Sequence, residues 1–153
     1  MLEYLNTYFR LNNIRESDIN EFKTQVLSHP NYPSLLAVSD TLSFLGVDNG
    51  AFPLSFDSIG ELPNNFVALL KTTQGQILPK LVEVNESKGF FKIHDYNNDG
   101  RTRTCTKNEL SEIWASTVFL VEGPEKAGKE KFRLVSFLAL SALFVSFLSM
   151  LLL

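Results

Sequence analysis

The hydrophobic residues of the first 46 positions recur every three or four residues, the spacing that gathers them on one face of a helix. Asn12 and Asn13 end the first of these segments, and Ser17 is a favourable residue to cap the second. Ser34 can cap a third, and Gly46 follows it where a left-handed residue often closes a helix. We therefore expect helices over residues 2–12 and 18–28 and between Ser34 and Gly46.

The pattern changes after Gly46, where short runs rich in β-branched and aromatic residues replace the helical spacing. The Asn and Gly residues between Asp95 and Arg101 accept a positive φ at low cost and predict a hairpin turn. A short helix over 108–114 is expected before the last run. The expected strands are 51–56, 65–71, 77–84, 89–95, 101–106 and 116–122. Helices followed by an antiparallel sheet predict an α+β domain.

The last twenty residues, 134–153, contain no charged residue, no Pro and no Gly. A helix of this length is about 30 Å long, which matches the hydrocarbon thickness of a bilayer. Its serine hydroxyls can bond carbonyls one turn back. We predict a transmembrane helix, with a buried core helix as the alternative. The organisation is then a soluble domain over 1–124, a basic linker over 125–133 and the apolar helix.

The composition of the linker indicates the orientation of the helix in the membrane, because the linker contains four basic residues and only two glutamates. Basic residues beside a spanning helix favour the cytoplasmic side, so we expect the domain there. The N-terminus lacks the order of a signal peptide. The helix is either a tail anchor or the first of several spans, and the second is favoured because spans normally end at polar or aromatic residues.

Composition excludes several classes of function. About 130 residues before the apolar segment suffice for one domain with one core. The net charge of −3 comes without a long basic stripe outside the linker, so nucleic-acid binding is not expected. Cys105 is the one cysteine, which rules out an internal disulfide and agrees with a reducing compartment. With only two histidines besides, zinc spacing is lacking, and we expect no metal or cofactor.

Several segments carry a resemblance to a known family over most of residues 15–122. They are YPSLLAVSDTLSFLGV, LPNNFVALL, KLVEV, FKIHDYNNDG and ELSEIWASTVFLVE. Together with the element order they resemble the bacteriocin-processing, double-glycine leader peptidases. The resemblance implies a papain-like cysteine peptidase fold on the cytoplasmic side of the inner membrane, usually attached to peptide-exporting ABC transporters. The HPNYPSLL…DTL form is also similar to the domain N-terminal to some bacterial vitamin K epoxide reductase-like membrane proteins.

The family's chemistry needs a Cys thiolate at a helix start, a His base, an Asp that orients the His, and an upstream Gln. The resemblance places Asp95 at the Asp position, but Pro79-Lys80 stand where the His is expected. The N-terminal helical region contains no Cys, and Gln25 has no nucleophile after it at the proper place. We therefore expect a degenerate member without thiol peptidase activity.

Two other chemistries compete with plain structural roles for the remaining residues. Cys105 and His94 lie on predicted partner strands, and their pairing depends on whether the register puts them on one face. A buried strand cysteine and a half-buried strand histidine are the simpler expectation, with His29 at a helix end. Asp95, Asn97, Asp99 and Gly100 imitate the start of an EF-hand loop, but Thr106 replaces its last glutamate and strands replace its helices. A tight turn without metal is favoured.

Two functional hypotheses remain. In the first, the membrane-anchored domain keeps the family's peptide groove and binds or positions a peptide or protein in a processing or export context. The candidate groove residues are aromatic, with core packing as the alternative for each: Tyr32, Phe66, Phe90, Phe91 and Trp114. In the second, it is a non-catalytic cytosolic regulatory domain of a vitamin K epoxide reductase-like, thiol-oxidising membrane protein, with further transmembrane segments beyond residue 153.

Overall fold

The computed structural model describes residues 2–85, 89–95 and 101–123. Three helices come first and an antiparallel sheet follows, so the predicted α+β order is confirmed. The sheet has six strands in the order β1-β6-β2-β3-β4-β5. The helices are α1 (Leu2–Leu11), α2 (Glu16–Leu27), α3 (Leu35–Phe44) and α4 (Lys107–Ile113), with a 3-10 helix, η1 (Phe56–Glu61). The strands are β1 (Asn49–Pro53), β2 (Asn65–Lys71), β3 (Ile77–Asn85), β4 (Phe90–Asp95), β5 (Arg101–Cys105) and β6 (Trp114–Val121).

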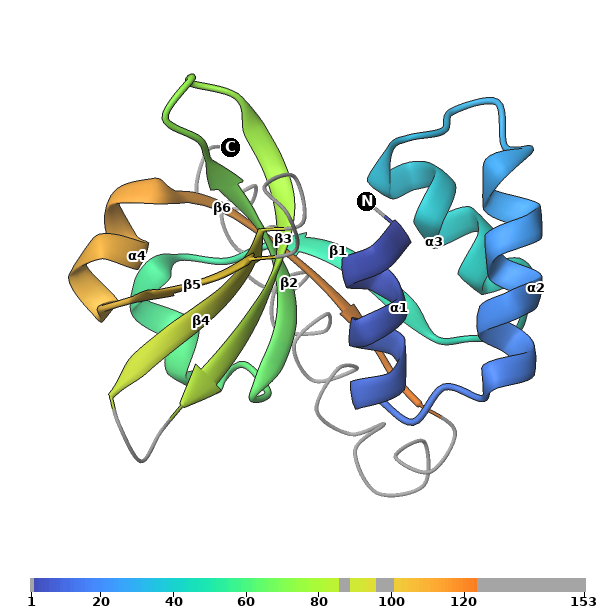
Figure 1. Ribbon diagram of the computed structural model, residues 1–153, viewed down its shortest axis with the longest axis horizontal. Coiled ribbons are helices and arrows are strands. Elements are labelled where there is room, and N and C mark those ends of the chain that lie inside the picture. The colour runs from blue at the N-terminus through green and yellow to red at the C-terminus, as the bar shows by residue number, and fades with distance from the viewer. Residues whose placement is uncertain (1, 86–88, 96–100, 124–153) are drawn as a thin grey trace, which may run out of the picture.

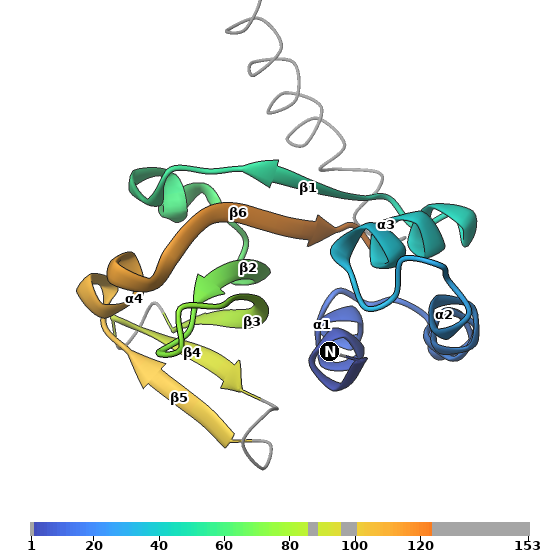
Figure 2. The ribbon, with the colours of Figure 1, turned by 90° about the horizontal axis from the view of Figure 1, so that it is seen from above.

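The elements form two halves (Figure 1). Helices α1–α3 lie together on one side of the sheet, and α4 lies at the opposite side of the molecule. Seen from above, β1 and β6 lie at one end of the curved sheet and β5 at the other (Figure 2). The sheet therefore has one face toward α1–α3 and another toward α4 and η1.

Two expectations about helix ends had different outcomes. Ser34 caps α3 as predicted, because its side chain accepts a hydrogen bond from the Ala37 amide. Ser17 does not cap α2, so that prediction was wrong. The helix begins two residues earlier than expected, at Glu16, and Arg15 occupies the cap position without a side-chain cap bond. Arg15 instead pairs with Asp18 in the first turn, a contact that the capping pattern does not reveal.

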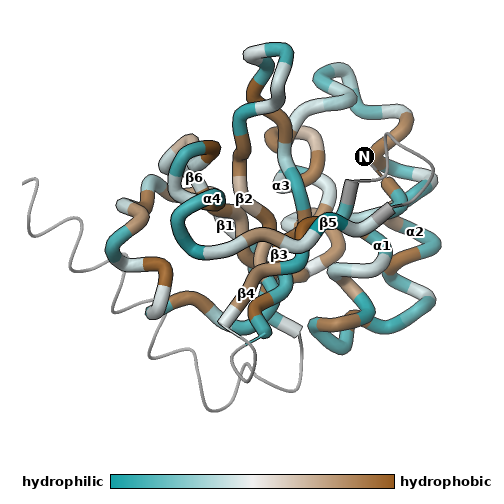
Figure 3. Tube along the Cα trace, turned by 60° about the vertical axis from the view of Figure 1, so that its left-hand side comes forward, coloured by the Kyte–Doolittle hydropathy of each residue, from teal (hydrophilic) through white to brown (hydrophobic). Residues whose placement is uncertain are grey.

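Strand alternation divides the interior into two cores. The first core lies between the sheet and α1–α3, and includes Val67, Leu81, Phe119 and Val121 from the strands. The second lies on the other face, where Phe66, Val82, Val118 and Leu120 meet α4 and η1. Figure 3 shows hydrophobic residues interspersed with hydrophilic ones along the helices and the strands. Neighbouring strand residues thus enter different cores.

One buried side chain ties the first helix to the last strand. The Tyr8 hydroxyl donates a hydrogen bond to the Phe119 carbonyl oxygen at 3.4 Å and accepts one from the Val121 amide at 3.2 Å. Burial raises the pKa of Tyr8, although the Val121 bond acts in the opposite direction. A neutral phenol is therefore retained, and it satisfies two backbone groups 111 and 113 residues away in the chain.

Helix α4 carries a capping box that the sequence analysis missed, and it yields a pH-dependent prediction. The Thr106 side chain accepts from the Glu109 amide, and the Glu109 carboxylate accepts from the Thr106 amide at 2.7 Å. That second bond holds the pKa of Glu109 below its usual value of 4.5. The Glu109 carboxylate therefore stabilises the folded state at pH values above its pKa in the unfolded chain. This stabilisation is lost as the pH falls through its lower pKa in the folded state.

We expect Thr106→Ala to lower the free energy of unfolding by about 1 kcal/mol at neutral pH. The difference from wild type should shrink at acid pH, once Glu109 is protonated in the folded state. Denaturant unfolding of both proteins at the two pH values measures this. An undiminished difference in acid would show that the bond from the Thr106 hydroxyl to the Glu109 carboxylate contributes nothing.

Among the described helices, none is long and apolar enough to cross a membrane. The predicted basic linker and transmembrane helix, residues 125–133 and 134–153, lie outside the described part of the chain, so both remain predictions.

Candidate functional site

The positions that the resemblance assigns to the base and the orienting acid lie on the neighbouring strands β3 and β4. Pro79 is opposite Leu69, and Lys80 is opposite Ala68 in the β2–β3 ladder. Because Ala68 belongs to the second core, the Lys80 side chain starts on the face away from α1–α3, and it is buried. Asp95 ends β4, where its backbone is in register with Arg101. Where the resemblance expects the imidazole, the structure thus has Pro79 and a buried lysine.

The structure answers whether Cys105 and His94 form a replacement pair. Cys105 is opposite Phe91, whereas His94 is opposite Leu81. Phe91 and Cys105 belong to the second core and Leu81 to the first, so the thiol and the imidazole lie on opposite faces of the sheet. No hydrogen bond between them is possible in this register, which contradicts a rebuilt catalytic pair.

The environment of Cys105 also disfavours a thiolate. The residue is 3 % exposed. Burial raises its pKa, and the nearby positive charge of Arg103 only partly opposes this. Reactive cysteines need a partly exposed, electropositive setting that lowers the pKa. Cys105 is therefore a core residue, as the simpler expectation had it, and the 153 residues contain no other thiol.

A polar cluster that the sequence analysis did not identify lies on the face toward α1–α3. Glu83 and Lys92 are directly opposite each other, and His94 is next along the same face of β4. The Glu83 carboxylate contacts the His94 Nε2 atom, and the Lys92 ammonium lies 3.6 Å from the same carboxylate oxygen. His94 is buried, whereas Glu83 and Lys92 are partly exposed. We call Glu83, Lys92 and His94 the sheet cluster.

The sheet cluster can orient an imidazole beside a carboxylate, which is half of the arrangement that activates a nucleophile. No described thiol lies on that face of the sheet, because Cys105 belongs to the other core. Opposite charges on neighbouring strands could have indicated the sheet cluster from the sequence. They indicate it only when the strand register is known, because the register sets Glu83 opposite Lys92.

The five candidate groove aromatics do not form one exposed surface. Phe66, Phe91 and Trp114 lie buried in the second core, where the Trp114 indole donates to the Leu54 carbonyl at 2.9 Å. These three therefore fill the interior, because alternate residues of their strands point away from α1–α3. Tyr32 packs against the first core and remains half-buried. Phe90 is half-buried at the start of β4. Only these two keep surface that a peptide could contact.

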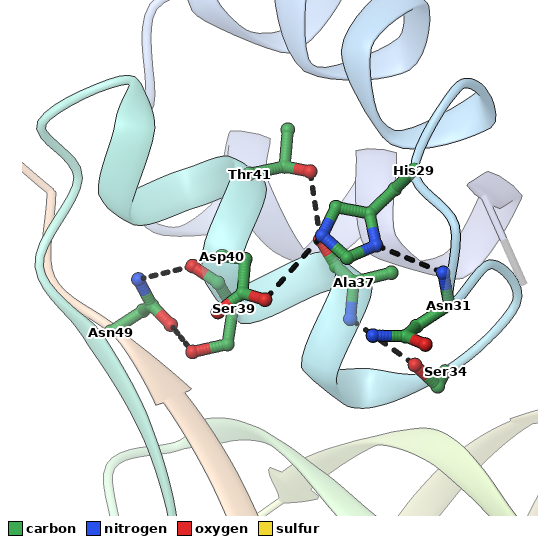
Figure 4. A network of polar contacts seen from close by, with 8 residues as sticks. All are labelled: His29, Asn31, Ser34, Ala37, Ser39, Asp40, Thr41 and Asn49. Carbon is green, nitrogen blue, oxygen red and sulfur yellow. Dashed lines mark hydrogen bonds and ion pairs between the residues drawn. The ribbon is translucent and has the colours of Figure 1, made fainter.

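The loop between α2 and α3 is held by side-chain contacts (Figure 4). His29 Nε2 lies 3.4 Å from the Asp40 carboxylate, and its Nδ1 atom accepts from the Asn31 amide at 3.1 Å. Asn49 at the start of β1 accepts from the Ser39 hydroxyl at 2.7 Å. The Tyr32–Pro33 peptide is cis. His29 and the segment after it thus build a defined loop, consistent with the helix-end role expected for this histidine.

Within the described ranges, no group of three His, Cys, Asp or Glu side chains could hold a metal ion. The loop that imitates an EF-hand lies mostly outside those ranges, at residues 96–100. Its flanks β4 and β5 are antiparallel partners, as the hairpin prediction required, and not the helices of a calcium site.

No protein-family model matches the chain, and no curated protein matches it. Solved structures do. The peptidase domain of Streptococcus ComA, a bi-functional ABC transporter involved in a quorum sensing pathway, is 10 % identical, over 69 % of this chain and 77 % of that one, with a TM-score of 0.53. The N-terminal peptidase C39-like domain of the toxin secretion ATP-binding protein from Vibrio parahaemolyticus is 12 % identical, over 80 % and 92 %, with a TM-score of 0.54.

At these identities the likeness establishes the fold: an α+β domain of the peptidase C39-like type, as the resemblance predicted. It does not transfer chemistry, which has to be judged from the residues of this chain.

Proposed function

We propose that this chain is a C39-like domain without peptidase activity that binds or positions a peptide in a processing or export context. The observation that carries the proposal is the place of Cys105, buried on the sheet face opposite His94 in a chain with no other cysteine. The fold supports the peptide context, because the two neighbours described above are a quorum-sensing ABC transporter domain and a toxin-secretion protein domain.

The proposed setting is a membrane. Residues 134–153 have the length and composition of a spanning helix, and the basic residues before it favour the cytoplasmic side. A domain tethered there would meet a peptide before its export or processing by a membrane partner.

The surface proposed for the peptide is the half-exposed row on the helix-facing side of β3 and β4. Phe90 and Lys92 alternate along β4, so they share this face with Glu83 of β3. An aromatic surface beside a charged pair suits an extended peptide with apolar and charged side chains. Tyr32 is the other candidate aromatic that keeps accessible surface.

Titration of labelled residues 1–124 with double-glycine leader peptides tests the proposal. Every described core residue lies between Tyr4 and Val121, so this fragment contains both cores. We expect saturable amide shifts on β3 and β4 in NMR spectra, with the peptide intact by mass spectrometry. Cleavage would show that a nucleophile has been overlooked. The absence of shifts at high peptide concentration would reject peptide binding.

We expect Phe90→Ala to weaken this binding by about tenfold, which corresponds to about 1.4 kcal/mol. Ile77→Ala is the matched control, since Ile77 is an exposed apolar residue on the same face of β3, at the other end of the strand. Isothermal titration compares the affinities. Equal effects of the two variants would place the peptide elsewhere.

The second candidate is a regulatory domain of a vitamin K epoxide reductase-like membrane protein. The observation that favours it is the HPNYPS loop, whose His29–Asp40 pair and Ser34 cap give this motif a defined structure without catalytic geometry. Lack of peptide binding, together with a change in thiol oxidation by the full membrane protein when the domain is deleted, would favour this candidate.

A further inference from the structure

The chain leaves the domain at a tightly packed point. The Glu122 amide donates to the Asp48 carbonyl at 2.8 Å, just beyond α3. Gly123 then passes so close to the end of α1 that a Cβ atom on it would lie 1.8 Å from the Asn12 carbonyl oxygen. The direction of exit is therefore set by the C-terminal ends of α1 and α3.

Two exposed apolar residues lie close in the chain to the residues that contact the exit. Leu11, the last residue of α1 and the neighbour of Asn12, is 41 % exposed. Phe44, the last residue of α3, is 77 % exposed and lies four positions before Asp48. We call Leu11 and Phe44, with the exit at Glu122 and Gly123, the exit face.

Part of the charge near the exit face is already neutralised. Arg10 pairs with Glu16 at 2.6 Å, and Arg15 pairs with Asp18 at 2.9 Å. Asp48 and Glu122 are the acidic residues at the exit itself, and the sequence places Lys126, Lys129, Lys131 and Arg133 soon after them. Basic residues so close to a spanning helix are attracted to lipid headgroups.

The sequence after the exit limits how far the face can lie from a bilayer. Ten residues, 124–133, separate Gly123 from the apolar segment. Fully extended, ten residues span no more than about 36 Å. The linker therefore keeps Gly123 within about 36 Å of the start of the apolar segment.

We propose that the exit face docks on the lipid surface, with Phe44 and Leu11 entering the interface between headgroups and acyl chains. The proposal rests on the membrane tether of the proposed function. It fixes the orientation of the domain, because α4 lies at the opposite side of the molecule from α3 (Figures 1 and 2). Aromatic and aliphatic side chains are the residues that such interfaces accept.

The test uses the full chain of residues 1–153 in phosphatidylcholine vesicles. A fluorophore is attached to Ser43→Cys, beside Phe44, or to Ser111→Cys on α4, and both serines are exposed. Cys105 is buried, and the unsubstituted chain serves as the labelling control. Lipids that carry a nitroxide near the headgroup should quench the label at position 43 several-fold more than the label at position 111.

Substitutions then identify the contact. Phe44→Ser and Leu11→Ser, made in the chain labelled at position 43, should reduce the quenching several-fold. Leu36→Ser is the matched control, because Leu36 is 56 % exposed at the other end of α3, and it should leave the quenching unchanged. All three positions are exposed, and unfolding curves check that the variants remain folded.

The other outcomes separate this inference from the one on which it rests. A chain that does not float with the vesicles rejects both the tether and the docking. A chain that floats but shows equal quenching at positions 43 and 111 rejects the docking alone. A blue-shifted but unquenched label at position 43 means that protein, such as a second copy, covers the face, and it also rejects the lipid contact.

Discussion

Phe119→Ala should lower the free energy of unfolding by about 3–5 kcal/mol, the range for truncation of a buried phenylalanine. Phe119 is fully buried in the first core and is in register with both Val67 of β2 and Ala51 of β1. Its carbonyl oxygen also accepts the Tyr8 hydrogen bond, so a cavity here disturbs the contact between α1 and the sheet. Urea unfolding of residues 1–124, followed by circular dichroism, measures the loss.

Phe44→Ala is the control for this prediction, because it removes the same atoms from a side chain that is 77 % exposed. In the isolated domain it should change stability by no more than about 0.5 kcal/mol. Similar losses for the two variants would mean that the helices do not pack on β6 as described, and would put the first core in doubt.

Gly123→Ala should destabilise the domain by about 1–3 kcal/mol, the usual cost of forcing extra atoms into a packed site. The new Cβ atom would lie 1.8 Å from the Asn12 carbonyl oxygen, which is backbone and cannot rotate away. Either the end of α1 or the exit of the chain must shift. The same urea unfolding measures the loss, and amide shifts at Asn12 and Asn13 should report the displacement.

Gly60→Ala is the matched control, since nothing lies within 4 Å of a Cβ atom at that position and its φ is not in the left-handed region. This substitution should leave stability unchanged or raise it by about 0.4–1 kcal/mol, because alanine lowers the conformational entropy of the unfolded chain. If Gly123→Ala were equally harmless, the close packing of the exit against α1 would be wrong, and with it the fixed direction of the exit face.

Local sequence patterns were sufficient to locate most of the helices and strands. The spacing of apolar residues located α1–α3, and β-rich runs located the strands of the sheet, because both periods are properties of neighbouring residues. Ser34 and Gly46 marked the ends of α3 correctly, and Gly46 has a φ of +72°. The first turn of α2 was misjudged, because the Arg15–Asp18 contact replaces a serine cap.

Some features of the candidate site could also be predicted from the sequence, and others could not. The lack of a second cysteine and the Pro79-Lys80 pair were readable from the chain, and they already argued against proteolysis. That Cys105 and His94 face opposite sides of the sheet was not readable, since a shift of one residue in register would reverse it. The sheet cluster escaped notice for the same reason.

The sequence by itself determined the α+β order, the presence of a single cysteine, and the apolar segment expected to span a membrane. These depend on composition and on contacts between residues near one another in the chain. The tertiary structure decided which aromatics are core, which face each strand residue occupies, and how Gly123 packs against the end of α1. Those depend on pairings across long separations, such as Tyr8 with Phe119 and Asn12 with Gly123. Their geometry is set only when the helices and the sheet pack together.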